Sequence, residues 1–382
     1  MSAPFIFTYG PQVISGPGEA LCLASLLPPG PVLFVTDRQI IELGLAAGAL
    51  LALEQSGRRV ILADDIEADP SRATLERTAE LGREGAAASV VGFGGGSPMD
   101  VAKLAAYLLG SGEDLDAIWG VGQTSGAGLP LVLVPTTAGT GSEATPVAII
   151  TLPGDEKRGV SSPALVAGHA LLDPTLTLGL PRAVTAATGI DAMVHAIEAY
   201  TSARLKNPLS DMLAREALRL LAANLLPACE TPGNLAAREA MLLGAHLAGV
   251  AFANAPVGGV HALAYPLGGR FHVPHGLSNA LMLPHVLNFN MDAALDLYAE
   301  LGPLVDPALG GLGRQAQARG LLETLRSLAE RSGMPSRLSQ VGVGPQDLDQ
   351  LAADAMLQQR LLSNNPRPIT QSDARQLYEA AL

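Results

Sequence analysis

The first part of the chain alternates short apolar runs with helical patterns, and this alternation restricts the possible folds more than any other feature of the sequence. The apolar runs are 31–37, 59–63, 89–93 and 131–134, and the helical patterns between them are 40–54, 73–83 and 99–109. Strands that alternate with helices are typical of βαβ units, in which helices cover both faces of a parallel sheet. We therefore expect an α/β domain with a mostly parallel sheet.

The pattern changes near Asp173-Pro174 and becomes long, helical and rich in alanine and leucine from Pro181 onward. Breaks in this helical pattern are expected at Gly189, Pro208, Pro232 and Gly258-Gly259. The sequence thus predicts an α/β domain over 1–180 and an all-helical domain over 181–382. Within the first domain, 147–150 and 157–160 are expected to pair as an antiparallel ribbon.

Composition and charge exclude several classes of protein. The 382 residues are 48% hydrophobic, which excludes a disordered or fibrous chain. The net charge of −12, with no run of Lys or Arg longer than two, predicts small-molecule ligands and no nucleic-acid partner.

Targeting and membrane signals are not apparent in the sequence. Two cysteines, Cys22 and Cys229, are too few for a disulfide framework, and the first ten residues do not resemble a signal peptide. The longest apolar stretch, 43–53, is shorter than the roughly 20 residues that span a bilayer, so we expect a buried helix there. We expect a cytoplasmic protein with no membrane partner.

Four residues of metal-ligand type lie in two apolar helical blocks. Asp191 and His195 are four positions apart, which places both side chains on one face of a helix. His261 and His275 follow in the second block, and the fold must bring them to the first pair. We expect all four to converge on one divalent cation.

The alternative for each of these residues is an ordinary core or surface role, because Asp/His pairs at this spacing also occur on helix surfaces. Apolar neighbours such as Met193 and Val194 weigh against a solvated face, since an unliganded buried carboxylate costs several kcal/mol. Three histidines and one aspartate leave an open coordination position for catalysis. Fe²⁺ or Zn²⁺ suits this donor set, as do Ni²⁺ and Co²⁺, and ligand type alone does not choose among them.

Two glycine-rich loops follow strands in the first domain. Gly94-Gly95-Gly96-Ser97-Pro98-Met99-Asp100 precedes a helix, so its backbone N–H groups can hold a pyrophosphate, although it does not match G-x-G-x-x-G. The loop 135–143 contains hydroxyls that can bond a nucleotide. A tight turn that uses glycine is the less favoured alternative for the first loop. A turn with an N-cap explains the composition of the second loop nearly as well.

Asp37 and two lysines are further candidates for cofactor contacts. Asp37 ends the first strand, where a carboxylate accepts from a ribose hydroxyl and repels a 2′-phosphate, favouring NAD over NADP. A helix-capping role is the alternative. Lys103 and Lys157 stand out because arginine supplies 21 of the 24 cations, although a surface role is the ordinary one for lysine.

The two glycine-rich loops are followed, in this order, by the segments 185–191 and 195–200 and by the histidine block, the segment that contains His261 and His275. With these segments in this order, the chain resembles the iron-containing (group III) alcohol dehydrogenases over nearly its whole length. The resemblance implies an N-terminal dinucleotide-binding domain, a helical metal-binding domain and hydride transfer between an alcohol and NAD. It also implies a divalent metal, with Fe²⁺ first, acting as a Lewis acid, and we expect a homodimer.

The resemblance also implies roles for individual residues. Asp191, His195, His261 and His275 match the metal ligands. The cofactor-binding positions are Asp37, Gly94, Gly95, Gly96, Ser97, Asp100, Thr136, Thr137, Ser142 and Lys157.

One position departs from the family's pattern. Many members have a second histidine four residues after the position of His261, where this chain has Tyr265. A phenol, with a pKa near 10, is a poorer base at neutral pH than an imidazole near 6.5. Proton transfer is therefore expected to involve Tyr265 and the nearby His272, together with water and ribose hydroxyls.

The substitution leaves other activities open. The main alternative is a hydroxyacid–oxoacid transhydrogenase or a maleylacetate-reductase-like enzyme. Some of these transhydrogenases resemble this chain in having a tyrosine at the position of Tyr265. A lyase of the dehydroquinate synthase type would need a cationic pocket, and few lysines surround the histidine block. A binding module without catalysis is the least expected, because all four ligands are present.

Overall fold

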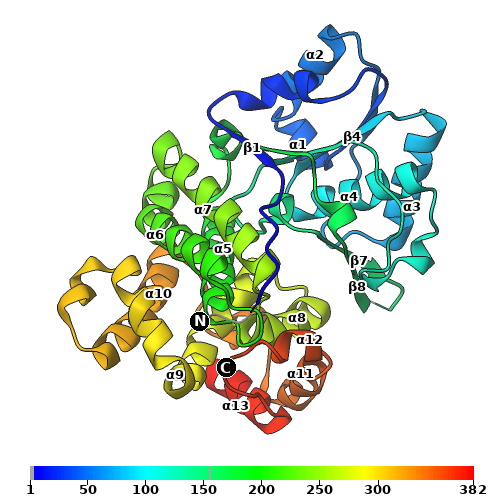
Figure 1. The fold of residues 1–382 in the computed structure, drawn as a ribbon. Helices are drawn as coiled ribbons and strands as arrows, with labels where there is room; N and C mark the ends of the chain where they lie inside the picture. Colours follow the sequence, from blue (N-terminus) through cyan, green and yellow to red (C-terminus); the bar gives the residue numbers. More distant parts are fainter. Residues whose placement is uncertain (1–3, 155) are drawn as a thin grey trace. The chain divides into compact units, whose positions relative to one another are not determined.

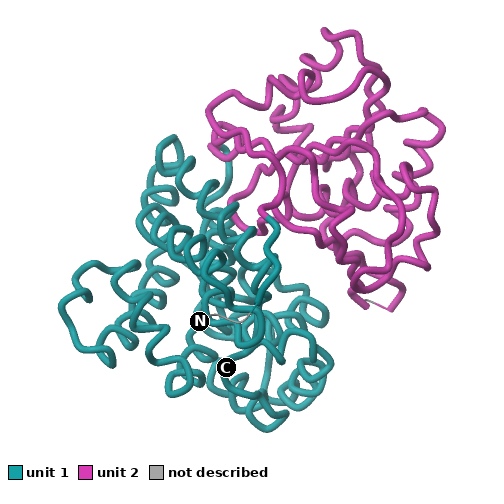
Figure 2. Tube along the Cα trace, viewed as in Figure 1, with its two compact units in different colours: residues 1–8, 179–382 teal, residues 9–178 magenta. Residues whose placement is uncertain are grey.

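The computed structural model describes residues 4–154 and 156–382, which divide into two compact units (Figure 2). One unit is Tyr9–Leu178, and the other is Gly179–Leu382 with the described residues before Tyr9. The expected boundary at residue 180 lies beside this division, but the first residues were expected in the α/β domain. Instead, Thr8 forms two hydrogen bonds with Asn254 of the helical unit. The Asn254 side chain accepts from Thr8 N at 2.7 Å and donates to Thr8 O at 2.8 Å.

A six-stranded parallel sheet forms the centre of the first unit, as predicted. In spatial order its strands are β1 (Gln12–Ser15), β9 (His169–Leu172), β6 (Leu131–Pro135), β4 (Ser89–Gly94), β2 (Val32–Val35) and β3 (Val60–Ala63). β1 and β9 were not predicted from the sequence.

Both faces of this sheet are covered, and β2 shows why the strand is apolar throughout. Leu33 and Val35 pack with α3 (Arg72–Glu84) and α4 (Gly96–Ser111), labelled in Figure 1. Val32 and Phe34 point to the opposite face, toward α2 (Ala47–Gln55) and the 3₁₀ segment Glu19–Leu26. Alternate side chains of a strand point to opposite faces, so a strand covered on both faces is apolar at every position.

The helical pattern 40–54 forms two helices rather than one. α1 (Arg38–Glu42) ends before Gly44, whose φ of 70° lies in the left-handed region, and α2 follows. Leu43 and Leu51 are 61% and 53% exposed, so the expectation of a buried helix over 43–53 is wrong for this part of the stretch.

A second, smaller sheet contains the predicted ribbon. β7 (Val147–Leu152) and β8 (Glu156–Ser161) pair antiparallel, as expected, and β5 (Gly120–Val121) pairs with β8 on its other side. The short β5 was not predicted, because two residues show no periodicity.

The second unit is helical throughout 179–382, a range that the structure describes completely (Figure 1). Its helices are α5 (Arg182–Thr201), α6 (Pro208–Glu230), α7 (Leu235–Asn254), α8 (Gly259–Phe271), α9 (His275–Val305), α10 (Arg314–Ser332), α11 (Leu348–Ala355), α12 (Gln359–Leu362) and α13 (Gln371–Ala381). α5 packs against α6, α7 and α9, and every residue from Gly189 to Thr201 is buried. It is therefore the central helix of this unit.

Gly189 does not break α5, contrary to expectation. A Cβ there would lie 2.6 Å from both Leu225 Cδ1 of α6 and Met241 Cε of α7, so glycine permits close helix packing. Pro208 and Gly259 begin helices and Pro232 lies between two helices, as predicted.

α7 is long and apolar enough to cross a membrane by length and composition, with a mean hydropathy of 1.3 in its most apolar window. Of that window, 61% is buried inside the protein, as is common for a core helix of a soluble protein.

Candidate metal centre and cofactor loops

Asp191 and His195 project from the central helix of the second unit. They are 2% and 5% exposed, because α5 is enclosed by α6, α7 and α9. The spacing of four residues places both on one face of the helix, as predicted.

His261 of α8 and His275 of α9 complete a cluster with this pair. One ligand atom from each of the four residues lies within 4.8 Å of the others. His261 is buried, whereas the side chain of His275 is 40% exposed. The structure therefore brings together the four residues that the sequence analysis selected, and one side of the cluster is open.

Glu198 orients His261 and was missed from the sequence. Its Oε2 lies 2.7 Å from His261 Nδ1, and its Oε1 accepts from Val260 N at 2.7 Å. A carboxylate only accepts, so the ring proton lies on Nδ1 and the Nε2 lone pair points toward the cluster. The spacing could have revealed this residue, because Asp191, His195 and Glu198 follow the i, i+4, i+7 pattern of one helical face.

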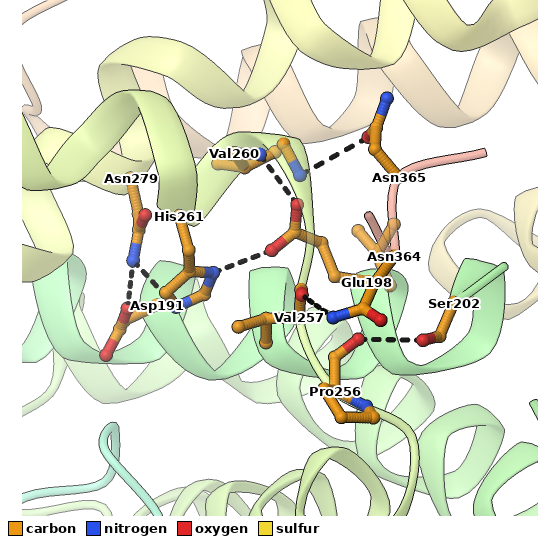
Figure 3. A network of polar contacts seen from close by, with 12 residues as sticks. Asp191, Glu198, Ser202, Pro256, Val257, Val260, His261, Asn279, Asn364 and Asn365 are labelled. Atoms are coloured by element: carbon orange, nitrogen blue, oxygen red, sulfur yellow. Dashed lines mark hydrogen bonds and ion pairs between the residues drawn. The ribbon is translucent and has the colours of Figure 1, made fainter. Parts of the chain in front are cut away.

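Asn279, also missed, lies in the middle of the cluster. Its Nδ2 is 2.6 Å from Asp191 Oδ1 and 3.2 Å from Nε2 of both His261 and His275 (Figure 3 shows its contacts with Asp191 and His261). Asp191 Oδ1 accepts, and so does His261 Nε2 in the tautomer that Glu198 sets. A carboxylate oxygen and imidazole nitrogens that face one point fit a bound cation. Asn279 is four residues after His275, so helical spacing was again the available signal.

The ionisation of Asp191 agrees with a cation bound in the cluster. Burial raises the pKa of the Asp191 carboxyl, but the imidazoles of His195, His275 and His261 and the Asn279 amide outweigh it, so the net shift is downward. The carboxylate therefore stays ionised, the form that binds metal. A divalent cation is the group that this donor set suits.

Two aromatic side chains lie beside the ligands. The Phe252 ring stacks on His195 with centroids 4.4 Å apart, and the Tyr265 ring centroid is 6.5 Å from that of His261 and 5.8 Å from that of His275. His272 is exposed and caps the C-terminus of α8 with a φ of 53°, an uncommon value outside glycine.

Gly276 lets the first turn of α9 approach α5. A Cβ at this position would lie 2.4 Å from Ala187 O and 3.3 Å from Asp191 Cβ. Ala187 O belongs to the helix backbone, so it cannot move aside as a flexible side chain would. The glycine beside His275 is therefore a packing requirement of the cluster.

Gly276→Ala is expected to lower the free energy of unfolding by about 1–3 kcal/mol, the usual cost of overpacking. Urea unfolding of the metal-free protein measures this change. Gly269→Ala in α8 is the matched control, because no atom lies within 4 Å of the added Cβ. Equal stability of the two variants would contradict the packing role of Gly276.

The first unit gathers the expected cofactor residues at one edge of its sheet. β4 lies between β2 and β6, and all three strands are parallel. Their carboxyl ends therefore bring Asp37, Gly94–Ser97 and Thr136–Thr137 to the same edge. The chain also runs from β2 to β3 at the margin and returns to β4 on the other side of β2, so this edge includes a topological switch point, where ligands bind in such sheets.

The glycine loop leads directly into α4, which begins at Gly96, three residues before the predicted start. Its N-cap is Gly95, which has no side chain to cap the first backbone N–H groups of the 16-residue helix. A Cβ at Gly95 would be 3.8 Å from Thr137 Oγ1, and one at Gly94 would be 3.6 Å from Asp37 Oδ2. Such an N-terminus suits a pyrophosphate, so the loop fits a dinucleotide.

Asp37 caps a helix, the role given in the sequence analysis as the alternative to a cofactor contact. Its Oδ1 accepts from Ile40 N at 2.9 Å at the start of α1. The second oxygen is the one near Gly94, which keeps a cofactor contact compatible with the cap.

Asp100 and Ser142 bond within the unit. Ser142 Oγ donates to Asp100 Oδ1 at 2.6 Å, and Asp100 Oδ2 accepts from Ile149 N at 2.9 Å. Both residues therefore hold the loop after β6 and the strand β7 against α4. Their direct contact with a cofactor stays a prediction.

Lys103 is 1% exposed, so the surface role is wrong for it, and its contact with a cofactor stays a prediction. Its Nζ lies 2.7 Å from Ser142 Oγ, 3.2 Å from Thr145 Oγ1 and 2.7 Å from Val147 O, which accounts for three ammonium hydrogens. Burial lowers the pKa of the Lys103 ammonium, while the charges of Asp100 and Glu143 act in the opposite direction. Lys157, on β8, forms an ion pair of 2.5 Å with Asp69, and its cofactor role stays a prediction.

Most of the chain matches one known protein family. Residues 10–174 match the family described as "Iron-containing alcohol dehydrogenase", and residues 185–382 match its C-terminal domain. The chain is 40% identical over 357 residues to long-chain-alcohol dehydrogenase 1 of Geobacillus thermodenitrificans (strain NG80-2), covering 92% of this chain and 89% of that protein.

Two solved structures have the same fold. A 1,3-propanediol oxidoreductase has 32% identity and a TM-score of 0.96, with 100% of each chain covered. A sulfoacetaldehyde reductase from Bifidobacterium kashiwanohense, in complex with NAD⁺, has 27% identity and a TM-score of 0.87, with coverage of 100% of this chain and 99% of that chain. The chain belongs to the iron-containing alcohol dehydrogenase family.

Proposed function

We propose that the protein interconverts an alcohol and its aldehyde or ketone with NAD(H), using a divalent metal held by Asp191, His195, His261 and His275. The observation that carries the proposal is the convergence of these four ligand atoms within 4.8 Å in a member of this family. We expect Fe²⁺ first, with Zn²⁺, Ni²⁺ or Co²⁺ able to replace it.

The chemistry that the bound groups supply is polarisation of the substrate oxygen by the metal and hydride transfer at the nicotinamide. The protein positions the ligands: Asp191 contributes the negative charge, and Glu198 fixes the tautomer of His261. The 40% exposure of the His275 side chain supports an opening for the substrate on that side of the cluster.

We assign the cofactor to the loops at the carboxyl edge of the sheet. Gly94, Gly95, Gly96 and Ser97 would hold the pyrophosphate at the N-terminus of α4, and Thr136 and Thr137 lie after the neighbouring strand. The NAD⁺ complex of the related sulfoacetaldehyde reductase supports a dinucleotide in this fold.

The substrate that we propose is a small or medium, partly apolar alcohol or carbonyl compound. Phe252 and Tyr265 lie beside the ligands, and relatives are named for long-chain alcohol and 1,3-propanediol. We also propose that Tyr265 and His272 take part in proton transfer. The assembly and location that we expect are a homodimer in the cytoplasm.

Metal removal tests the proposal most directly. Chelator-treated protein is expected to lose cofactor-reducing activity over a panel of alcohols, diols and hydroxy acids, and to regain it with Fe²⁺ or another divalent ion. The measurement is NADH formation by absorbance, with the same protein before chelation as control. Full activity in metal-free protein would contradict the proposal, and exchange between hydroxy acids and oxo acids without free NAD would indicate a transhydrogenase.

Asp37→Gly is expected to raise kcat/KM with NADP relative to NAD by about tenfold, because repulsion of the 2′-phosphate is removed. Glycine is also an acceptable N-cap and costs only a few tenths of a kcal/mol. The matched control is Ser71→Gly, which removes a cap of the same kind from α3. An unchanged cofactor ratio would remove Asp37 from the nucleotide site.

A further inference from the structure

The first turn of α8 is capped by side chains from two distant segments. Gly258, the N-cap, has no side chain, so the N–H groups that follow it need partners from elsewhere. Val260 N donates to Glu198 Oε1 of α5 at 2.7 Å, and Gly259 N donates to Asn365 Oδ1 at 3.3 Å (Figure 3). The next residue is His261, so the cap and the candidate metal ligand belong to the same turn.

Glu198 joins the cap to the ligand. The oxygen that does not accept from Val260 N contacts His261 Nδ1 at 2.7 Å, and the glutamate is 6% exposed. One carboxylate therefore sets both the backbone and the ring of the ligand. A change in the position of this turn moves the imidazole relative to Glu198.

Asn365 connects this turn to the helix that carries His275. Its side chain and that of Asn290 in α9 exchange two hydrogen bonds of 2.8 Å each, and Asn365 Nδ2 also lies 2.6 Å from Arg367 O. Asn290 and Asn365 are 2% and 6% exposed. This buried amide pair links α8, α9 and the segment before α13. Arg367 is exposed and bonds Phe289 O at 2.9 Å.

The preceding residue holds the chain that enters α8. Asn364 Nδ2 donates to Val257 O at 3.0 Å, and Asn364 O accepts from Ala203 N at 2.8 Å, just after α5. Residues 364–365 thus bond the entry of α8, the region after α5 and α9. These are the three helices that supply the four ligands.

The glycines at the entry allow this close approach. A Cβ at Gly259 would lie 2.7 Å from Asn365 Oδ1 and 2.8 Å from Ile369 Cδ1. One at Gly258 would lie 3.3 Å from both Asn365 N and Cα. A side chain at Gly259 therefore displaces Asn365 from its hydrogen bonds.

We propose that Glu198 and Asn365 are positioning residues that hold His261 for metal binding, so that the C-terminal segment 364–365 sets the affinity of the metal site. The inference rests on the proposed function, because it requires the four-residue cluster to bind a metal. Groups beyond the ligands typically change metal affinity 10- to 100-fold when they orient a ligating histidine.

The test is direct metal binding by the full-length, metal-stripped chain, without an activity assay. Zn²⁺ dissociation constants come from competition with a chromogenic chelator, and the visible spectrum of bound Co²⁺ reports ligand geometry. Glu198→Gln and Asn365→Ala are each expected to raise the Zn²⁺ dissociation constant by about 10- to 100-fold and to alter the Co²⁺ spectrum. Circular dichroism of the metal-free variants establishes that they fold.

A glycine pair keeps the test decisive if Asn365→Ala does not fold. Gly259→Ala is expected to weaken Zn²⁺ binding by about tenfold, whereas Gly269→Ala, in the same helix with no atom within 4 Å of the new Cβ, should match wild type. Folded Glu198 and Gly259 variants with wild-type affinity and Co²⁺ spectrum would overturn the inference. A wild-type chain that binds neither ion would instead overturn the proposed function, and the inference with it.

Discussion

Asp191→Asn is expected to lower kcat/KM by about 10³-fold, the largest effect that we predict for a single substitution. In the wild-type protein Asn279 Nδ2 lies 2.6 Å from Asp191 Oδ1. The asparagine side chain has nearly the same shape as aspartate and keeps an oxygen for this contact. It loses the negative charge that attracts a divalent ion, while three imidazoles stay in the cluster. The measurements are steady-state kinetics with NAD and the metal content of the purified protein.

The control for this prediction is Asp292→Asn, the same change at an exposed position of α9. It should keep wild-type kinetics and metal content. Asp191→Asn with near wild-type activity would exclude the carboxylate from the metal site. Reduced activity with full metal content would place the defect in the reaction and leave metal retention intact.

Gly95→Ala is expected to raise KM for NAD by about 10- to 100-fold, with a smaller change in kcat. The φ of −77° at Gly95 is accessible to alanine, and the nearest atom to the new Cβ is Thr137 Oγ1 at 3.8 Å. The protein alone therefore tolerates the methyl group. A phosphate that approaches the α4 N-terminus would not, and hydrogen bonds to such charged groups are worth about 1.5–3 kcal/mol each.

Gly168→Ala is the matched control in the same unit, because its Cβ would also make an ordinary contact, 3.5 Å from Leu131 O. Its KM for NAD should equal that of wild type, and both variants should unfold at the wild-type temperature. An unchanged KM in Gly95→Ala would exclude the glycine loop from contact with the cofactor.

The strands and helices of the first unit were mostly predictable because their signals are local. β2, β3, β4 and β6 begin and end within two residues of the apolar runs that indicated them. The helix pair at 38–55 was predicted as one helix because apolar periodicity continues across Gly44, and only its left-handed φ of 70° shows the break.

Glycine and lysine were the least predictable residues, since their roles depend on neighbours far along the chain. Gly189 suggested a break in a helix, but Leu225 and Met241 leave no room for a side chain there. A surface role was the ordinary expectation for Lys103, but it is buried, and acceptors from Ser142, Thr145 and Val147 surround its ammonium group. Such partners, 36 to 52 positions away, do not appear in a local pattern.

The candidate metal centre combines both kinds of information. The sequence by itself determined the half-site, because helical geometry places Asp191 and His195 on one face whatever the helix packs against. Only the tertiary structure decided that His261 and His275 join them within 4.8 Å, and that Glu198 and Asn279 contact these ligands. The physical reason is that helix periodicity is a property of adjacent residues, whereas the meeting of α5, α8 and α9 depends on how their buried faces pack.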